Sequence, residues 1–173
     1  MTTDEYEDLR CEYKPDRIRV LFVGESRPAN GTFFYMGNSM LFKHTMRCFG
    51  EHCNRPWRDP ADFLTFVKSK DCYLDDLCRE PVNHLDRKTR RWRRAKAVCD
   101  LAGRIRQYRP QAVVCVMRGI EPYVRDALAQ AELEDVPFYS LPFPARGYQE
   151  AYCRELWEAL VDLIRRGILD CDC

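Results

Sequence analysis

Four stretches of the chain are apolar along most of their length and are short enough to be strands. The predicted strands are residues 17–24, 72–78, 111–117 and 136–143. Segments with apolar residues at helical spacing lie between these strands and after the last one. The predicted helices are residues 38–49, 59–70, 86–108, 119–133 and 148–167. Strands that are apolar throughout, without alternation, are typical of a parallel sheet covered on both faces. The pattern therefore predicts a three-layer α/β/α fold with a central four-stranded parallel sheet.

The length and composition are those of one globular domain. The chain has 173 residues, of which 46% are hydrophobic and 32% charged. Residues 1–16 are polar and acidic, so we expect a flexible lead-in there and a single domain over 17–173. No apolar stretch is long enough to span a membrane, and the N-terminus does not resemble a signal peptide. We expect a cytoplasmic protein without a membrane partner.

Ten cysteines are many for this length. In a cytoplasmic protein they are expected to be reduced. Two pairs are close in sequence, but neither has the C-x2-C spacing common in structural zinc sites. These pairs are Cys48 with Cys53 and Cys72 with Cys78. Cys171 and Cys173 could bind a metal at the C-terminal end. Ordinary thiols are favoured over a metal cluster, and no cofactor is predicted.

Ligands of open α/β sheets bind outside the carboxyl ends of the strands. Those ends are predicted at Gly24, Asp75–Asp76, Met117 and Leu141. Glu25 follows the first strand, and the aromatic residues 33–35 come shortly after it. The carboxylate could face a crevice and the rings could form its wall. A solvated glutamate with aromatics in the core is the alternative, and composition alone favours it.

The other strand ends also carry polar groups. Asp75 and Asp76 are adjacent, so their side chains should face opposite sides of the sheet, with at least one near the core or a pocket. Helix capping or loop bracing would explain the pair equally well. Arg146 and Gly147 stand just before a predicted helix start, where backbone N–H groups and an arginine can bind phosphate. A turn with an exposed arginine is the alternative.

Residues 86–96 are strongly basic, although the formal net charge of the chain is only +1. Seven of these eleven residues are Lys or Arg. On a helix they would form a broad basic face, which indicates either a solvated surface or a nucleic-acid contact. The density of arginine favours phosphate binding.

Taken together, these stretches resemble the uracil-DNA glycosylase superfamily over about residues 17–165. "VLFVGES" followed by Pro28 resembles its first motif, and "GTFFYMGNSMLF" the segment after it. "DCYLDDLC" resembles the strand that carries the base-reading asparagine, and "QAVVCVMRGIEPYVRDAL" the third strand and helix. "SLPFPARGYQEAY" stands in place of the second motif.

The resemblance implies a uracil-DNA glycosylase-like fold and a DNA glycosylase that flips a nucleotide into a pocket and hydrolyses its N-glycosidic bond. Glu25 would be catalytic, by activating water or stabilising the cationic sugar. DNA would be the partner, and no obligatory protein partner is predicted. The implied base-binding residues are Ser26, Phe33, Phe34, Asn38 and Asp76. The implied DNA-binding residues are Arg27, Arg90, Arg91, Arg93, Arg94, Arg146 and Gly147.

Three departures from the superfamily pattern are informative. The second motif usually supplies a histidine that helps the leaving base, but Pro142 or Phe143 stands there. The three histidines, at 44, 52 and 84, lie elsewhere in the sequence, which puts that assistance in doubt. The four-cysteine iron–sulfur pattern of some members is not recognisable either.

The third departure is Asp76 at the base-reading position, where the family commonly has asparagine. An ionised aspartate only accepts hydrogen bonds, so it would repel O4 of uracil and suit the N4 amine of cytosine. We therefore expect a cytosine-type or modified base, such as glucosylated hydroxymethylcytosine of phage DNA, and a role in antiviral defence. If the alignment is off by one residue, Asp75 would face the pocket instead.

Three other functions remain open. The enzyme could be a uracil-DNA glycosylase in base-excision repair. A protein that binds DNA or nucleotides without catalysis would fit the missing histidine. A different hydrolase on a similar scaffold is also possible, because fold alone does not determine function.

Overall fold

The computed structural model describes residues 2–170 and contains one four-stranded sheet with helices on both sides. The strands are β1 (Val20–Gly24), β2 (Cys72–Asp76), β3 (Ala112–Cys115) and β4 (Phe138–Ser140). All of the strand pairs are parallel, and the strand order is β2-β1-β3-β4. The predicted three-layer α/β/α fold with a four-stranded parallel sheet is thus confirmed.

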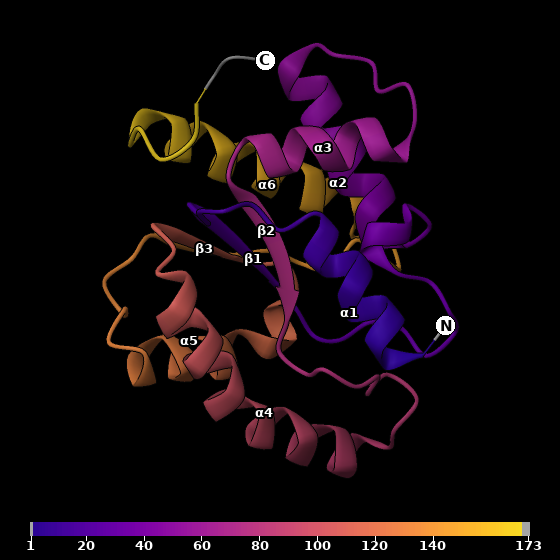
Figure 1. Ribbon diagram of the computed structural model, residues 1–173, viewed down its shortest axis with the longest axis vertical. Helices are drawn as coiled ribbons and strands as arrows, with labels where there is room; N and C mark the ends of the chain where they lie inside the picture. The colour runs from indigo at the N-terminus through magenta and orange to yellow at the C-terminus, as the bar shows by residue number, and fades with distance from the viewer. Residues whose placement is uncertain (1, 171–173) are drawn as a thin grey trace.

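The helices cover the two faces of the sheet. Helices α2, α3 and α6 lie on one side, and α4 and α5 on the other (Figure 1). The α-helices are α1 (Thr3–Glu12), α2 (Met40–Cys53), α3 (Pro60–Ser69), α4 (Arg87–Tyr108), α5 (Glu121–Gln130) and α6 (Gln149–Arg165). Two short 3-10 helices are η1 (Phe34–Met36) and η2 (Arg118–Ile120). Each of the five helices predicted from apolar spacing is present, with ends shifted by a few residues.

Local signals in the sequence start several of these helices. The Asp59 side chain accepts a hydrogen bond from the backbone N–H of Asp62 at 2.8 Å, and Pro60 occupies the first turn of α3. Asp86 caps α4 in the same way, accepting from the backbone N–H groups of Lys88 and Thr89. These starts are local, so the sequence alone was sufficient to predict them.

The strand register brings three carboxyl ends to one level. Gly24 lies opposite Asp76 in the β1–β2 pair, and Val23 lies opposite Cys115 in the β1–β3 pair. Every residue of these three strands is buried. The segments that follow β1, β2 and β3 therefore leave the core at the same edge of the sheet.

Residues 3–12 form helix α1, where the sequence analysis expected a poorly ordered lead-in. A capping box starts the helix, since Thr2 and Glu5 each accept a hydrogen bond from the backbone N–H of the other. Tyr6 and Arg10 are buried, and α1 lies beside β2 (Figure 1). The helix has no continuous apolar stripe, so its polar composition concealed it although Thr2 and Glu5 form a capping-box pattern.

Within residues 2–170, no helix is both long and apolar enough to cross a membrane. Five cysteines are buried free thiols, namely Cys48, Cys72, Cys78, Cys115 and Cys153. Across the same residues, no group of three or more His, Cys, Asp or Glu side chains is arranged to hold a metal ion. Cys171 and Cys173, the other candidate metal ligands, lie outside the described residues.

Candidate base-binding pocket

A cavity of about 290 Å³ opens at the carboxyl ends of β1, β2 and β3. Its volume is at the lower end of the range for small-molecule sites. The wall is largely apolar, with contributions from Phe33, Phe34, Met40, Leu41, Leu74 and Val116. Polar groups interrupt that wall, among them Glu25, Ser26, Arg27, Asp76, Asn83 and Arg90. The cavity thus joins segments as far apart in sequence as Gly24 and Phe143.

Glu25 is held in place by two arginines of α4. Its side chain follows β1 directly, and the residue is only 8% exposed. Arg90 donates from Nε to Oε1 at 2.7 Å and from a second nitrogen to Oε2. Arg94 donates from Nε to Oε1 at 2.5 Å. The carboxylate is therefore fixed at the pocket wall, with two positive charges offsetting its negative charge.

The three consecutive aromatics have different environments. Phe33 and Phe34 line the pocket and are buried. Phe33 packs edge-on against Tyr6 of α1, with 5.3 Å between ring centroids. Tyr35 is not among the lining residues; its hydroxyl donates to the backbone carbonyl of Leu74 at 2.7 Å and so braces β2. Two of the three rings are thus available to contact a bound base.

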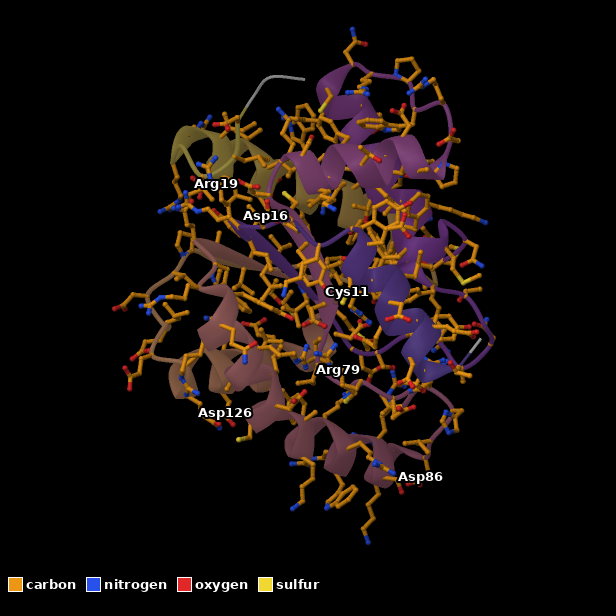
Figure 2. The ribbon with its side chains drawn as sticks, in the orientation of Figure 1. Cys11, Asp16, Arg19, Arg79, Asp86 and Asp126 are labelled. Carbon is orange, nitrogen blue, oxygen red and sulfur yellow. The ribbon has the colours of Figure 1, made fainter. Side chains whose placement is uncertain are left out.

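Asp75 and Asp76 face different surroundings, as alternation along a strand requires. Asp76 lines the pocket, whereas Asp75 is completely buried on the side of α4. Asp75 accepts hydrogen bonds from Arg104 and, at 3.1 Å, from the hydroxyl of Tyr108. Arg79 lies between the end of β2 and α4, 3.7 Å from Asp75 (Figure 2). The structure therefore places Asp76, and not Asp75, in the pocket.

The two aspartates have opposite pKa shifts. Burial raises the pKa of Asp76 above its ordinary value, and the nearby Arg10 offsets only part of this effect. Burial also acts to raise the pKa of Asp75, but Arg104, Arg10 and Arg79 outweigh it and hold that pKa below its ordinary value. Of the two aspartates, Asp76 is thus the one that is more easily protonated.

Three of the predicted residues near Glu25 have identifiable partners. The Ser26 hydroxyl accepts from the backbone N–H of Val82 at 3.2 Å. The Arg27 guanidinium lies 4.3 Å from the ring centroid of Tyr6. Both residues line the pocket. Asn38 does not; its side-chain oxygen accepts from the backbone N–H of Phe33 at 2.8 Å, which orders the aromatic segment.

The predicted basic face of α4 divides into two parts. Arg90 and Arg94 turn toward Glu25. Arg91 and Arg93 are exposed on the outer surface, where the Arg93 guanidinium lies 5.5 Å from the ring of the exposed Trp92. Arg91 and Arg93, like the exposed Arg87, Lys88 and Lys96, do not line the pocket and are available to contact a nucleic-acid backbone directly.

A second, more open hollow of about 580 Å³ adjoins the pocket and shares Arg90, Met117 and Phe143 with it. Arg118 and Arg146 bring positive charge to this hollow. Arg146 and Gly147 both have positive φ, at 53° and 90°, in the turn that precedes α6. Arg146 lines the hollow and Gly147 does not. Phe143 and Tyr148 are exposed there, so the hollow combines cations with aromatic rings.

Sequence reasoning missed Arg10 and Asn83. The carboxamide oxygen of Asn83 accepts from the backbone N–H of Ala29 at 3.0 Å and holds the loop after β1 against the pocket. Arg10 contacts Asp76 from a segment expected to be unstructured. Neither residue belongs to a local motif, so no sequence signal could have marked them.

Comparisons with known proteins give no family for the chain. A scan against protein-family models finds no match. A search of curated proteins also finds none of significant similarity. The resemblance to uracil-DNA glycosylases therefore stays a prediction, and the proposed function rests on the geometry of the pocket.

Gly24 allows Asp76 to approach β1 closely. A Cβ at Gly24 would lie 2.4 Å from Oδ1 of Asp76. We expect Gly24→Ala to displace this carboxyl group and to lower the free energy of unfolding by about 1–3 kcal/mol, measured by urea denaturation. Gly103→Ala is the control, because a Cβ placed there meets nothing within 4 Å apart from its chain neighbours and the backbone of its own helix. Equal stability of Gly24→Ala and the unmodified protein would contradict this packing.

Proposed function

We propose that the protein is a DNA glycosylase that hydrolyses the N-glycosidic bond of a flipped base, preferably cytosine-type or modified. The observation that carries the proposal is the pocket itself. One cavity at the carboxyl ends of the strands combines a buried carboxylate, two phenylalanine rings and a base-edge carboxyl group, contributed by Glu25, Phe33, Phe34 and Asp76. Arginines at its wall and in the adjoining hollow supply positive charge suited to DNA phosphates.

Each group has a role in this reaction. A flipped base would contact Phe33 or Phe34, and base–aromatic contacts contribute about 1–3 kcal/mol per base. When the glycosidic bond breaks, the base leaves with the bonding electrons and positive charge develops on the sugar. Glu25 would stabilise that charge and accept a proton from the water that adds to C1′. The departing base would take up a proton from solvent, and Glu25 would then return its proton to solvent.

Asp76 would read the Watson–Crick edge of the base. An ionised Asp76 accepts a hydrogen bond and suits the N4 amine of a cytosine-type base. The open hollow beside the pocket offers space for a bulky substituent on such a base. Glucosylated hydroxymethylcytosine of phage DNA is one substrate with these properties, and antiviral defence is the biological role that we propose.

Two alternative functions each have one observation in their favour. The raised pKa of Asp76 favours uracil, because a protonated carboxyl group can donate to O4. The engagement of both Glu25 oxygens by Arg90 and Arg94 favours a non-catalytic DNA or nucleotide binder, since a water must compete with two guanidinium groups.

Mass spectrometry of released bases tests the three functions together. Oligonucleotides containing cytosine, 5-hydroxymethylcytosine, its glucosylated form or uracil are incubated with the protein. Release of a cytosine-type base supports the proposal, whereas efficient release of uracil alone supports the repair enzyme. If no oligonucleotide loses a base yet all of them bind, the binder is the better conclusion.

The outer face of α4 makes a separate prediction about DNA binding. Replacing Arg91 or Arg93 with glutamine should weaken binding to all sequences and reduce the slope of log K against log salt by about 1. Fluorescence anisotropy over a range of salt concentrations measures the slope. Arg165→Gln is the control, since this exposed arginine is at the end of α6. Unchanged slopes for both variants would place the DNA elsewhere.

A further inference from the structure

Helix α1 brings a buried arginine to the carboxyl group that lines the pocket. We propose that Arg10 is a positioning residue, which holds one oxygen of Asp76 and leaves the other, as a hydrogen-bond acceptor, to select the base. This inference rests on the proposed function. It gives helix α1 a part in selecting the base that binds in the pocket.

Arg10 is fixed on several sides. It is 1% exposed, and it donates to Oδ2 of Asp76 at 2.8 Å. Its other terminal nitrogen donates to the carbonyl of Leu74 and to Oδ1 of Asp75, both at 3.3 Å. The guanidinium also lies 5.1 Å from the ring centroid of Phe33. A group held in this way cannot rotate freely, so Oδ2 of Asp76 is committed to it.

The second oxygen of Asp76 is in a different situation. No hydrogen bond within residues 2–170 involves Oδ1. This oxygen lies against Gly24, in the space that a Cβ would otherwise fill, and Asp76 is a lining residue of the pocket although only 5% exposed. Oδ1 is not one of the fully buried unpartnered side-chain atoms of residues 2–170, so it keeps some accessible surface and can accept a hydrogen bond from a ligand in the pocket. Oδ1 is therefore the atom that a base edge would contact.

Arg10 also influences whether Oδ1 accepts or donates. The charged and titratable groups around Asp76 are Arg10 of α1, Tyr35 of η1, Asp75 of β2, Cys78 after β2 and Arg104 of α4. Burial and Asp75 favour the protonated form, while Arg10 and Arg104 favour the ionised one. With Oδ2 bound to Arg10, a proton on Asp76 would reside on Oδ1. Removing the charge of Arg10 should raise the pKa of Asp76 further and so favour the protonated form, in which Oδ1 donates.

The predicted effect of Arg10→Met is a change in base preference, in the same direction as Asp76→Asn. The ratio of cytosine-type to uracil release should fall about 10-fold, as for the loss of one base-edge contact. Arg10→Lys retains the charge and should retain the preference. Arg125→Met, at an exposed ion pair of α5, is the control for altered surface charge. If Arg10→Met slows the release of cytosine-type bases and of uracil equally, Arg10 has a merely structural role and the inference is overturned.

The pH profile gives a second readout. Asp76 is ionised above its pKa and neutral below it, so the cytosine preference should grow as pH rises through that pKa. Loss of Arg10 raises the pKa, and the transition should move to higher pH. A profile that does not move in Arg10→Met would also overturn the inference.

Carbon-13 NMR of the Asp76 carboxyl group tests the same coupling without any activity. Asp76→Asn assigns the signal, which is then titrated in the unmodified protein, Arg10→Lys and Arg10→Met. A higher midpoint in Arg10→Met alone supports the inference, and equal midpoints contradict it. If Arg10→Met does not fold, two other results are used. A normal titration midpoint in Arg10→Lys together with recovery of folding in Arg10→Met/Asp76→Asn supports the inference. The inference is overturned if neither result is obtained. If the protein releases no base from any DNA, the glycosylase proposal fails, while the titration still judges Arg10.

Discussion

Replacement of Glu25 with glutamine is expected to reduce base release by at least about 10²-fold while sparing DNA binding. Glutamine has nearly the same shape, but it can neither take a proton from water nor offset positive charge on the sugar. The residue lies in the pocket wall and is only 8% exposed, so the substitution acts on the pocket and on the ion pairs with Arg90 and Arg94. Alkaline cleavage of labelled oligonucleotides measures abasic sites, and fluorescence anisotropy measures binding.

The control for this substitution is Glu134→Gln, at an exposed position after α5. Thermal unfolding of Glu25→Gln is needed as well, because the substitution weakens the ion pairs with Arg90 and Arg94. Undiminished base release by a folded Glu25→Gln variant would remove Glu25 from the mechanism. Weaker DNA binding in step with slower release would indicate that Glu25 organises the arginines instead.

The largest stability effect is expected at Arg104. This residue donates to Asp75, which is 0% exposed, and to the carbonyl of Leu77 at 3.3 Å. Arg104→Met would leave the buried carboxylate of Asp75 with only part of the positive charge that offsets it. Removing one partner of a buried ion pair costs about 3–5 kcal/mol, and we expect about 3 kcal/mol because Arg10 and Arg79 remain near Asp75. Guanidinium denaturation measures the change.

The pH dependence of stability provides a second test of the ion pairs that Asp75 makes with Arg104, Arg10 and Arg79. The pKa of Asp75 is below its ordinary value, so its contribution is present above the unfolded-state pKa of about 3.9 and is lost as pH falls through the folded-state pKa. Arg104→Met should raise the folded-state pKa and move the acid transition to higher pH. Arg125→Met, at an exposed pair, should cost at most about 1 kcal/mol. Similar losses in both variants would contradict a special role for the network.

The sequence was sufficient for much of the fold and for the place of the pocket. Apolar runs mark the strands, and Asp59 and Asp86 mark two helix starts, because these signals act within a few residues. The rule that ligands bind at the carboxyl ends of parallel strands pointed to Glu25 and Asp76, and both line the cavity. Alternation along β2 also indicated that the two aspartates would separate.

The charge pairing in the pocket could not be read from the chain. Arg10 and Asp76 are 66 positions apart, and Glu25 and Arg90 are 65 apart. Such pairs follow no periodicity, since they depend on how α1 and α4 pack against the end of the sheet. The basic segment at 86–96 predicted a surface for DNA, yet two of its arginines turn inward because a buried carboxylate requires compensation. Local pattern therefore indicates where the strands end, and long-range electrostatics sets which charges meet there.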